Sequence, residues 1–227
     1  MINIDELYLL ILVPTLILSI WAQIKVKTTF ARYSKIQNSK GITGAQMASY
    51  IMKTNGIDDV KIGHISGNLT DHYSPTKKEL KLSNPVYGVN SVAAIGVAAH
   101  ESGHAIQHKR KYFPLVLRST LVPMANIGSA FGPTLTIIGI IFSFGILIDL
   151  GILLFGAAVA FYLITLPVEI NASSRAVKIL RASNLFEEEE LKGVKKVLTA
   201  AALTYVASAL TAIVNLLRLI LLSKRDD

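Results

Sequence analysis

The chain has 227 residues, 52% of them hydrophobic, and its mean hydropathy is +0.49. This composition excludes an ordinary soluble domain and predicts that much of the chain faces lipid. The formal net charge is +8, but the sequence has no nucleic-acid-binding motif and no basic stretch interleaved with aromatic residues, so no nucleic-acid partner is expected. Cysteine is absent, which excludes disulfide bonds and thiolate metal ligands.

Four stretches without charged residues are long enough to cross a hydrocarbon core as helices, since one crossing takes about 20 residues. They are residues 7–24, 119–148, 150–168 and 197–217. The first follows Asp5 and Glu6 rather than a basic region, which predicts a retained anchor and not a cleaved signal peptide. The second contains Pro123 and Pro133, so we expect a kinked or interfacial first half and a crossing at residues 134–148.

Basic residues gather where the chain leaves the predicted spans. Most of them lie in residues 25–40, 109–118 and 175–196. Because cytoplasmic segments next to spans carry an excess of Lys and Arg, the N-terminus is expected outside and both polar segments in the cytoplasm. The last five residues would then lie outside. A basic surface facing the membrane accounts for the net charge better than binding to nucleic acid.

The first polar segment shows patterns of a helix and of strands. Residues 44–53 have the apolar spacing of a short helix capped by Thr43. Residues 60–64 and 79–83 alternate as strands do, with turn signals between them, and are expected to pair into a small sheet. Such a sheet either presents an edge that holds an extended peptide or is a hairpin that only covers the next helix.

The next helix, capped by Asn90 or Ser91, carries His100-Glu101-x-x-His104. On a helix, histidines four residues apart share one face, where they can bind the same Zn²⁺. The motif also leaves Glu101 beside a metal-bound water. This pattern predicts a zinc hydrolase centre, and the alternative is a chance pattern on a structural helix.

A catalytic zinc usually has three protein ligands, so one more is expected. His108 is about 12 Å along a continuous helix from His100, which is too far to share the ion. Glu169 follows the third apolar stretch, where a carboxylate is costly unless it is paired or bound to metal. The small residues after Glu169 are expected to pack on the Gly103 face. The alternative for Glu169 is a salt bridge with Arg175 or with a basic flank.

Three runs of the sequence together resemble one family. They are Leu69–Pro75, Ser91–Gln107 and Leu166–Glu169. The chain is similar over nearly its whole length to the YugP-like zinc-dependent membrane metallopeptidases of prokaryotes. The resemblance implies a neutral zinc metallopeptidase in the inner cell membrane, with one zinc per chain in a gluzincin-like centre. His100, His104 and Glu169 would hold the metal, and Glu101 would activate water.

The chain departs from that family pattern after the third ligand. Relatives often carry an acidic residue there, whereas this chain has Asn171 and Ser173. Neutral groups can orient a ligating imidazole by hydrogen bonds, but they raise its basicity less than a carboxylate does.

The expected reaction is hydrolysis of a peptide bond in membrane-associated or cytoplasmic polypeptides. A zinc-bound water attacks, and Glu101 takes its proton and passes it to the leaving amine. A further donor to the oxyanion is expected, and the sequence does not rank its four candidates, Tyr73, His72, His108 and Arg175. The alternative is a catalytically silent zinc-binding scaffold or regulator. A transporter is disfavoured because no predicted span has a charged residue near its centre.

The expected fold is a mainly α-helical integral membrane protein with about four transmembrane helices and a small α+β zinc-peptidase domain at the cytoplasmic face. The lipid bilayer and a polypeptide substrate are its expected partners. Its expected segments are an anchor at 1–24, a cytoplasmic peptidase segment at 25–118, a transmembrane hairpin at 119–168, a cytoplasmic helical segment with the third ligand at 169–196, and a last transmembrane helix and tail at 197–227.

Overall fold

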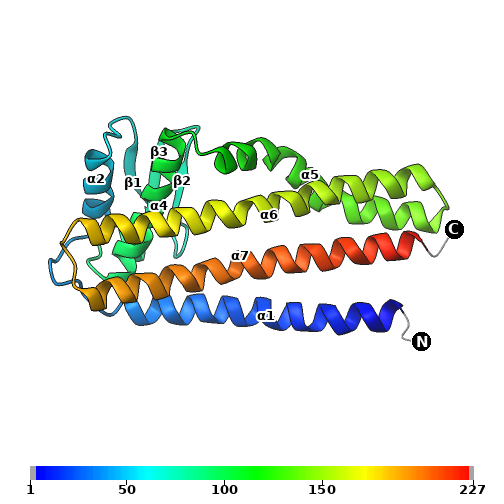
Figure 1. Ribbon diagram of the computed structural model, residues 1–227, viewed down its shortest axis with the longest axis horizontal. Coiled ribbons are helices and arrows are strands. Elements are labelled where there is room, and N and C mark those ends of the chain that lie inside the picture. Colours follow the sequence, from blue (N-terminus) through cyan, green and yellow to red (C-terminus); the bar gives the residue numbers. More distant parts are fainter. Residues whose placement is uncertain (1–3, 225–227) are drawn as a thin grey trace. The chain divides into compact units, whose positions relative to one another are not determined.

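The computed structural model describes residues 4–224, and side chains from residue 9 onward. Within this range the chain is mainly helical with one small sheet (Figure 1). The helices are α1 Ile4–Tyr33, α2 Gly44–Thr54, α3 Asn84–Tyr87, α4 Val92–Lys109, α5 Phe113–Ile141, α6 Gly145–Ala182 and α7 Glu188–Ser223. The strands are β1 Lys61–Ile65, β2 His72–Ser74 and β3 Glu79–Ser83. The ends of the first and last predicted segments, 1–3 and 225–227, lie outside the described residues, and so does most of the expected tail.

Two compact units divide the chain. The apolar unit comprises residues 1–23, 116–167 and 203–227, and the mixed unit comprises residues 24–115 and 168–202. The helices α1, α6 and α7 contribute residues to both units. The predicted functional residues all belong to the mixed unit.

The apolar unit draws on the helices that are long and apolar enough to cross a membrane. In the described part of the chain these are α5, α6, α7 and residues 9–33 of α1, so the number of candidate spans is the expected four. The expected crossing at residues 134–148 is wrong. The helix α5 runs on through both of its prolines to Ile141, the chain turns at Ser143 with φ 55°, and α6 begins at Gly145.

The physical reason is that a charge-free stretch gives no signal for a turn within it. Small residues instead mark where α5 packs closely on α6. A Cβ atom added to Gly128 would overlap the Leu154 carbonyl oxygen, and one added to Gly132 would lie 2.8 Å from the Cβ atom of Phe155.

The sheet of the mixed unit has the strand order β1-β3-β2. The predicted strands pair in parallel, with Lys61 opposite Glu79, so the hairpin interpretation of these two runs is wrong. The hairpin partner of β3 is β2, which pairs antiparallel to it. Asp71, directly before β2, accepts hydrogen bonds from the Ser83 amide and hydroxyl, both at 2.7 Å. This contact ties the start of β2 to the end of β3.

The helix α4 runs through the hydrophobic core of the mixed unit. Its first turn is capped by Ser91, whose Oγ accepts from the Ala94 amide at 3.1 Å. The core contains side chains from α2, β3, α4 and the mixed-unit parts of α6 and α7. The helix α2 begins at Gly44 as expected and ends at Thr54, one residue later than expected. Thr43 caps it, in a capping box with Gln46. Packing on several sides holds α4 in place as a rigid support for its polar side chains.

Candidate metal centre

Three predicted ligand side chains meet in the mixed unit. His100 and His104 project from α4, and Glu169 comes from α6. The Nε2 atoms of the two imidazoles are 3.2 Å apart. The Oε2 atom of Glu169 lies 3.2 Å from Nε2 of His100 and 3.5 Å from Nε2 of His104. The carboxylate is buried, and both imidazoles keep a small exposed fraction, so small molecules can reach the cluster.

The separations of these atoms match those around a tetrahedral zinc ion. With ligand bonds of about 2.0–2.1 Å, two ligand atoms on one zinc lie about 3.3–3.4 Å apart. The observed separations of 3.2, 3.2 and 3.5 Å are close to that value. Imidazole nitrogen and carboxylate oxygen are also the atoms that zinc binds when thiolate is absent. The residues therefore fit a zinc ion with three protein ligands and one position left for water.

A close helix contact brings Glu169 to the histidines. A Cβ atom added to Gly103 would lie 2.8 Å from the carbonyl oxygen of Ala172 and 3.2 Å from its Cα atom. Only glycine allows the backbones of α4 and α6 to approach this closely. The expectation that small residues after Glu169 pack on the Gly103 face is confirmed.

A buried amide fixes the orientation of His104. Gln107 is fully buried, and its Nε2 donates to the Val168 carbonyl oxygen at 2.8 Å and to Asn171 Oδ1 at 3.0 Å. With both amide hydrogens used, Gln107 Oε1 accepts from His104 Nδ1 at 3.0 Å. A proton on Nδ1 leaves the lone pair of Nε2 facing the other two ligand atoms.

Two further polar residues after Glu169 support the cluster. The Oγ atom of Ser173 lies 3.0 Å from His100 Nδ1, so it can accept a hydrogen bond from a proton on Nδ1, and the opposite ring nitrogen then keeps its lone pair. The Nε atom of Arg175 donates to Asn171 Oδ1 at 2.7 Å. Arg175 forms no ion pair with a described acidic residue, so the alternative of a salt bridge between it and Glu169 is not realised.

Gln107 is the residue of this arrangement to which sequence reasoning gave no role. It lies three residues after His104, on the same face of the helix, and directly follows the apolar residues Ala105 and Ile106. That spacing is the signal that could have indicated it. Its partners on α6 come from a distant part of the sequence, however, and no helical periodicity predicts them.

The electrostatic environment of His104 favours positive charge. Burial lowers the pKa of its imidazole, but the hydrogen bond to Glu169, the charges of Glu101 and Glu169 and the contact with Gln107 together hold that pKa above its ordinary value. Surroundings that stabilise a proton also stabilise a metal cation. Glu101 is itself buried, and its carboxylate forms no hydrogen bond or ion pair with another described residue.

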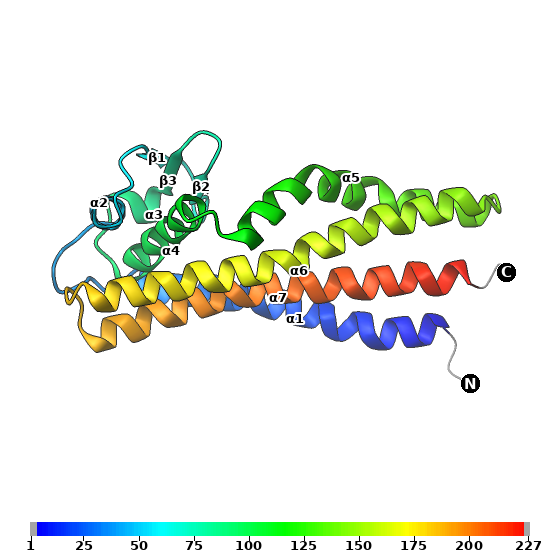
Figure 2. The same ribbon diagram turned by 45° about the horizontal axis from the view of Figure 1, so that its top comes forward.

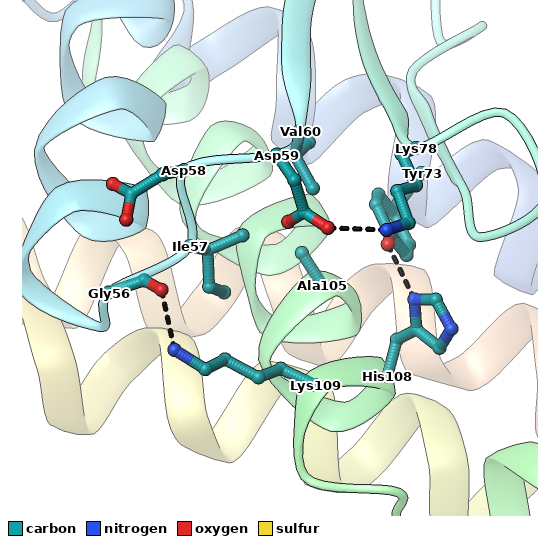
Figure 3. Close-up of a pocket in the computed structure, with 10 residues that line it drawn as sticks. All are labelled: Gly56, Ile57, Asp58, Asp59, Val60, Tyr73, Lys78, Ala105, His108 and Lys109. Atoms are coloured by element: carbon teal, nitrogen blue, oxygen red, sulfur yellow. Dashed lines mark hydrogen bonds and ion pairs between the residues drawn. The ribbon is translucent and has the colours of Figure 1, made fainter.

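A cavity of about 520 Å³ opens along α4 (Figure 3). Its lining includes Ala105 and His108, which lie four and seven residues after Glu101 and therefore on the same helix face. Asp59 and Lys78 form an ion pair across another part of the lining. Glu101 is not among the lining residues, but it precedes Ala105 by one turn on the same face of α4, and the cavity walls are partly polar.

A hydrogen-bonded pair in this cavity joins two of the four predicted oxyanion donors. The Tyr73 hydroxyl lies 2.7 Å from Nδ1 of His108 (Figure 3). Burial raises the pKa of Tyr73, and the charge of Asp59 adds to this, so the phenol keeps its proton at neutral pH. Whichever partner donates within the pair, one hydrogen, on the hydroxyl or on the imidazole Nε2, is left for a ligand.

The other two predicted oxyanion donors are engaged elsewhere. His72 is exposed, and its Nδ1 donates to the carbonyl oxygen of Thr70 at 2.9 Å. Arg175 holds Asn171, as described above. His72 and Tyr73 belong to β2, a strand that the short sequence run does not predict, since its pairing with β3 depends on a distant segment.

Comparison with known proteins gives two matches. The family model described as "Putative neutral zinc metallopeptidase" matches residues 8–224. A Bacillus subtilis (strain 168) protein named "Putative membrane protease YugP" is 49% identical over 223 residues, which cover 97% of this chain and 99% of the relative. No solved structure matches the chain.

Proposed function

Because the chain belongs to this neutral zinc metallopeptidase family, we propose that it is a membrane-bound zinc metalloendopeptidase. Its substrates are membrane-associated or cytoplasmic polypeptides. The observation that carries the proposal is the set of three ligand atoms, which are spaced as they would be around a tetrahedral zinc. Glu101, which directly follows the ligand His100 in the sequence, is buried as well. The centre is gluzincin-like and holds one zinc per chain.

His100, His104 and Glu169 hold the metal in this proposal, and Glu101 is the general base. Zinc bound there supplies a Lewis acid that acidifies water and polarises the scissile carbonyl. Glu101 takes the proton from water and delivers it to the leaving amine. Gln107 and Ser173 keep the imidazoles oriented while this happens.

The cavity along the α4 face that carries Glu101 supports a place for the substrate. We assign Tyr73 and His108 as the pair that donates the spare hydrogen to the developing oxyanion. The position of His108 on the helix face of Glu101 and its hydrogen bond with Tyr73 favour this pair over His72 and Arg175, which are used elsewhere.

The proposed place of the reaction is the cytoplasmic interface of the inner membrane. The basic residues that follow the apolar stretches support this orientation. In this arrangement segments 25–118 and 169–196 both lie in the cytoplasm, and they provide the two halves of the metal centre. Segments 1–24, 119–168 and 197–227 then anchor the protein in the membrane.

The test compares the wild-type full-length protein with Glu101→Gln in detergent or nanodiscs. We expect Glu101→Gln to keep one zinc per chain, measured by plasma mass spectrometry, and to lose about 10²–10⁴-fold of its casein-cleaving rate, because a general base is removed and no ligand is. Glu189→Gln, at an exposed acid, is the matched control and keeps both. Tyr73→Phe is a second arm, expected to lower kcat with zinc content unchanged.

Two results would contradict the proposal. The silent scaffold would be indicated if the wild-type protein binds zinc but, like Glu101→Gln, cleaves no peptide under any condition. Loss of zinc from Glu101→Gln would mean that this carboxylate is a ligand and not the base.

A further inference from the structure

A second cavity of about 590 Å³ lies between two helix segments of the mixed unit. Residues 170–181 of α6 and 188–202 of α7 form its walls. These segments run antiparallel, side by side (Figures 1 and 2). We call this cavity the α6–α7 groove, and its lining differs between its two ends.

One end of the groove is apolar. Ile170, Leu198 and Ala202 line it, and the side chain of Ile170 is 55% exposed. In the sequence these residues adjoin the end of the third predicted span and the start of the fourth. An exposed isoleucine at that place is favourable where the surroundings are acyl chains.

The other end of the groove is basic. Arg181 is paired with Glu188 at 2.7 Å, and Lys192 with Glu189 at 2.6 Å, so these charges are largely balanced. Lys178 and Lys195 also line the groove, and neither forms an ion pair or hydrogen bond with another described residue. Two uncompensated ammonium groups, one from each helix, therefore face one cavity.

We propose that the α6–α7 groove binds one anionic phospholipid. Its phosphate lies between Lys178 and Lys195, and an acyl chain runs along Ile170 and Leu198 toward the membrane. An apolar and a basic end in one elongated cavity match a molecule with a long apolar part and a single anionic head. A soluble anion would use only the lysines, and an apolar peptide would leave them unpaired.

The groove also adjoins the metal centre. Ser173, which lines it, is the residue that contacts His100 Nδ1 at 3.0 Å. A bound lipid would therefore lie beside a residue that orients a proposed zinc ligand. The lipid proposal itself does not rest on the proposed chemistry, because its test measures lipid and not peptide cleavage.

The test is native mass spectrometry of the full-length protein, purified in detergent and mixed with dioleoyl phosphatidylglycerol or dioleoyl phosphatidylcholine. We expect wild type to retain one phosphatidylglycerol in preference to phosphatidylcholine. The double variant Lys178→Gln/Lys195→Gln should weaken phosphatidylglycerol binding about 25-fold, from two lysines at roughly a fivefold effect each. Ser174→Trp, which fills the groove without changing charge, should also abolish it.

The matched control is Lys35→Gln/Lys196→Gln, which removes two exposed lysines outside the groove and should bind as wild type does. Equal losses in the control and test pairs would overturn the proposal, since net charge alone would explain binding. It would also be overturned if glycerol 1-phosphate competed for the groove as strongly as the lipid does. The same holds if the test pair lost binding only to a soluble acidic peptide and still bound phosphatidylglycerol. Unchanged zinc content and melting temperature in each variant exclude misfolding as the cause.

Discussion

At the scale of single residues, Gln107 determines which nitrogen of His104 is available. Its two amide hydrogens are used by α6, so its oxygen must face the imidazole and accept from it. A glutamate at this position would accept from His104 but would lose both donor contacts. The amide is therefore the side chain that satisfies α6 and the ligand at once.

Gln107→Leu is expected to lower zinc affinity about 10–100-fold, because the imidazole loses the partner that fixes its tautomer. It should also destabilise the fold by about 1–3 kcal/mol, since the Val168 carbonyl oxygen and Asn171 lose a donor in a buried place. Competition with a zinc-binding dye measures the first effect and thermal unfolding the second. Gln37→Leu, at an exposed glutamine, is the control. Zinc affinity equal to that of wild type would show that Gln107 only packs.

At the scale of elements, the site depends on how closely α4 and α6 approach. The contact of Gly103 with the Ala172 backbone lies one residue from His104 and three residues from Glu169. Because the opposing atoms are backbone, neither helix can make room by a side-chain rotation. A small displacement of the helices would move the carboxylate away from both imidazoles.

Gly103→Ala is therefore expected to weaken zinc binding by at least about tenfold and to destabilise the protein by about 1–3 kcal/mol, as overpacking usually does. Gly156→Ala is the control, since a Cβ atom there meets no described atom within 4 Å. That change should leave zinc affinity unaltered. Zinc titration of both variants is the measurement, and an unaffected Gly103→Ala would mean that the helices tolerate wider spacing.

At the scale of the whole molecule, two proposed crossings separate the histidines from Glu169 in the sequence. An even number of crossings returns the chain to the side from which it started, so both halves of the centre can lie on one side of the membrane. The proposed topology is thus a condition for the proposed metal site.

The absence of cysteine makes this topology directly testable by single-cysteine labelling. Lys40→Cys and Lys77→Cys should react with an impermeant maleimide only after cells are opened, because the polar segments are cytoplasmic. Phe144→Cys, in the turn between α5 and α6, should react on intact cells. Labelling of Lys40→Cys on intact cells would invert the proposed orientation.

The sequence by itself determined the elements whose causes are local. Helical spacing predicted His100, Glu101 and His104 on α4, the capping residues predicted its start and that of α2, and charge-free length predicted the four membrane-long helices. Glu169 was inferred because a carboxylate at the end of an apolar stretch needs a partner. Each of these inferences depends on periodicity, capping or solvation within one short segment.

Only the tertiary structure decided how distant segments meet. Four features could not be read from the residues next to them in the sequence. They are the parallel pairing of β1 with β3, the place of the turn between α5 and α6, the hydrogen bonds of Gln107 and the Tyr73–His108 pair. The physical reason is that a buried donor can be satisfied by any acceptor that the fold brings near it. Spacing along the chain predicts which residues share a helix face, whereas the partner of that face is set by the packing of the whole core.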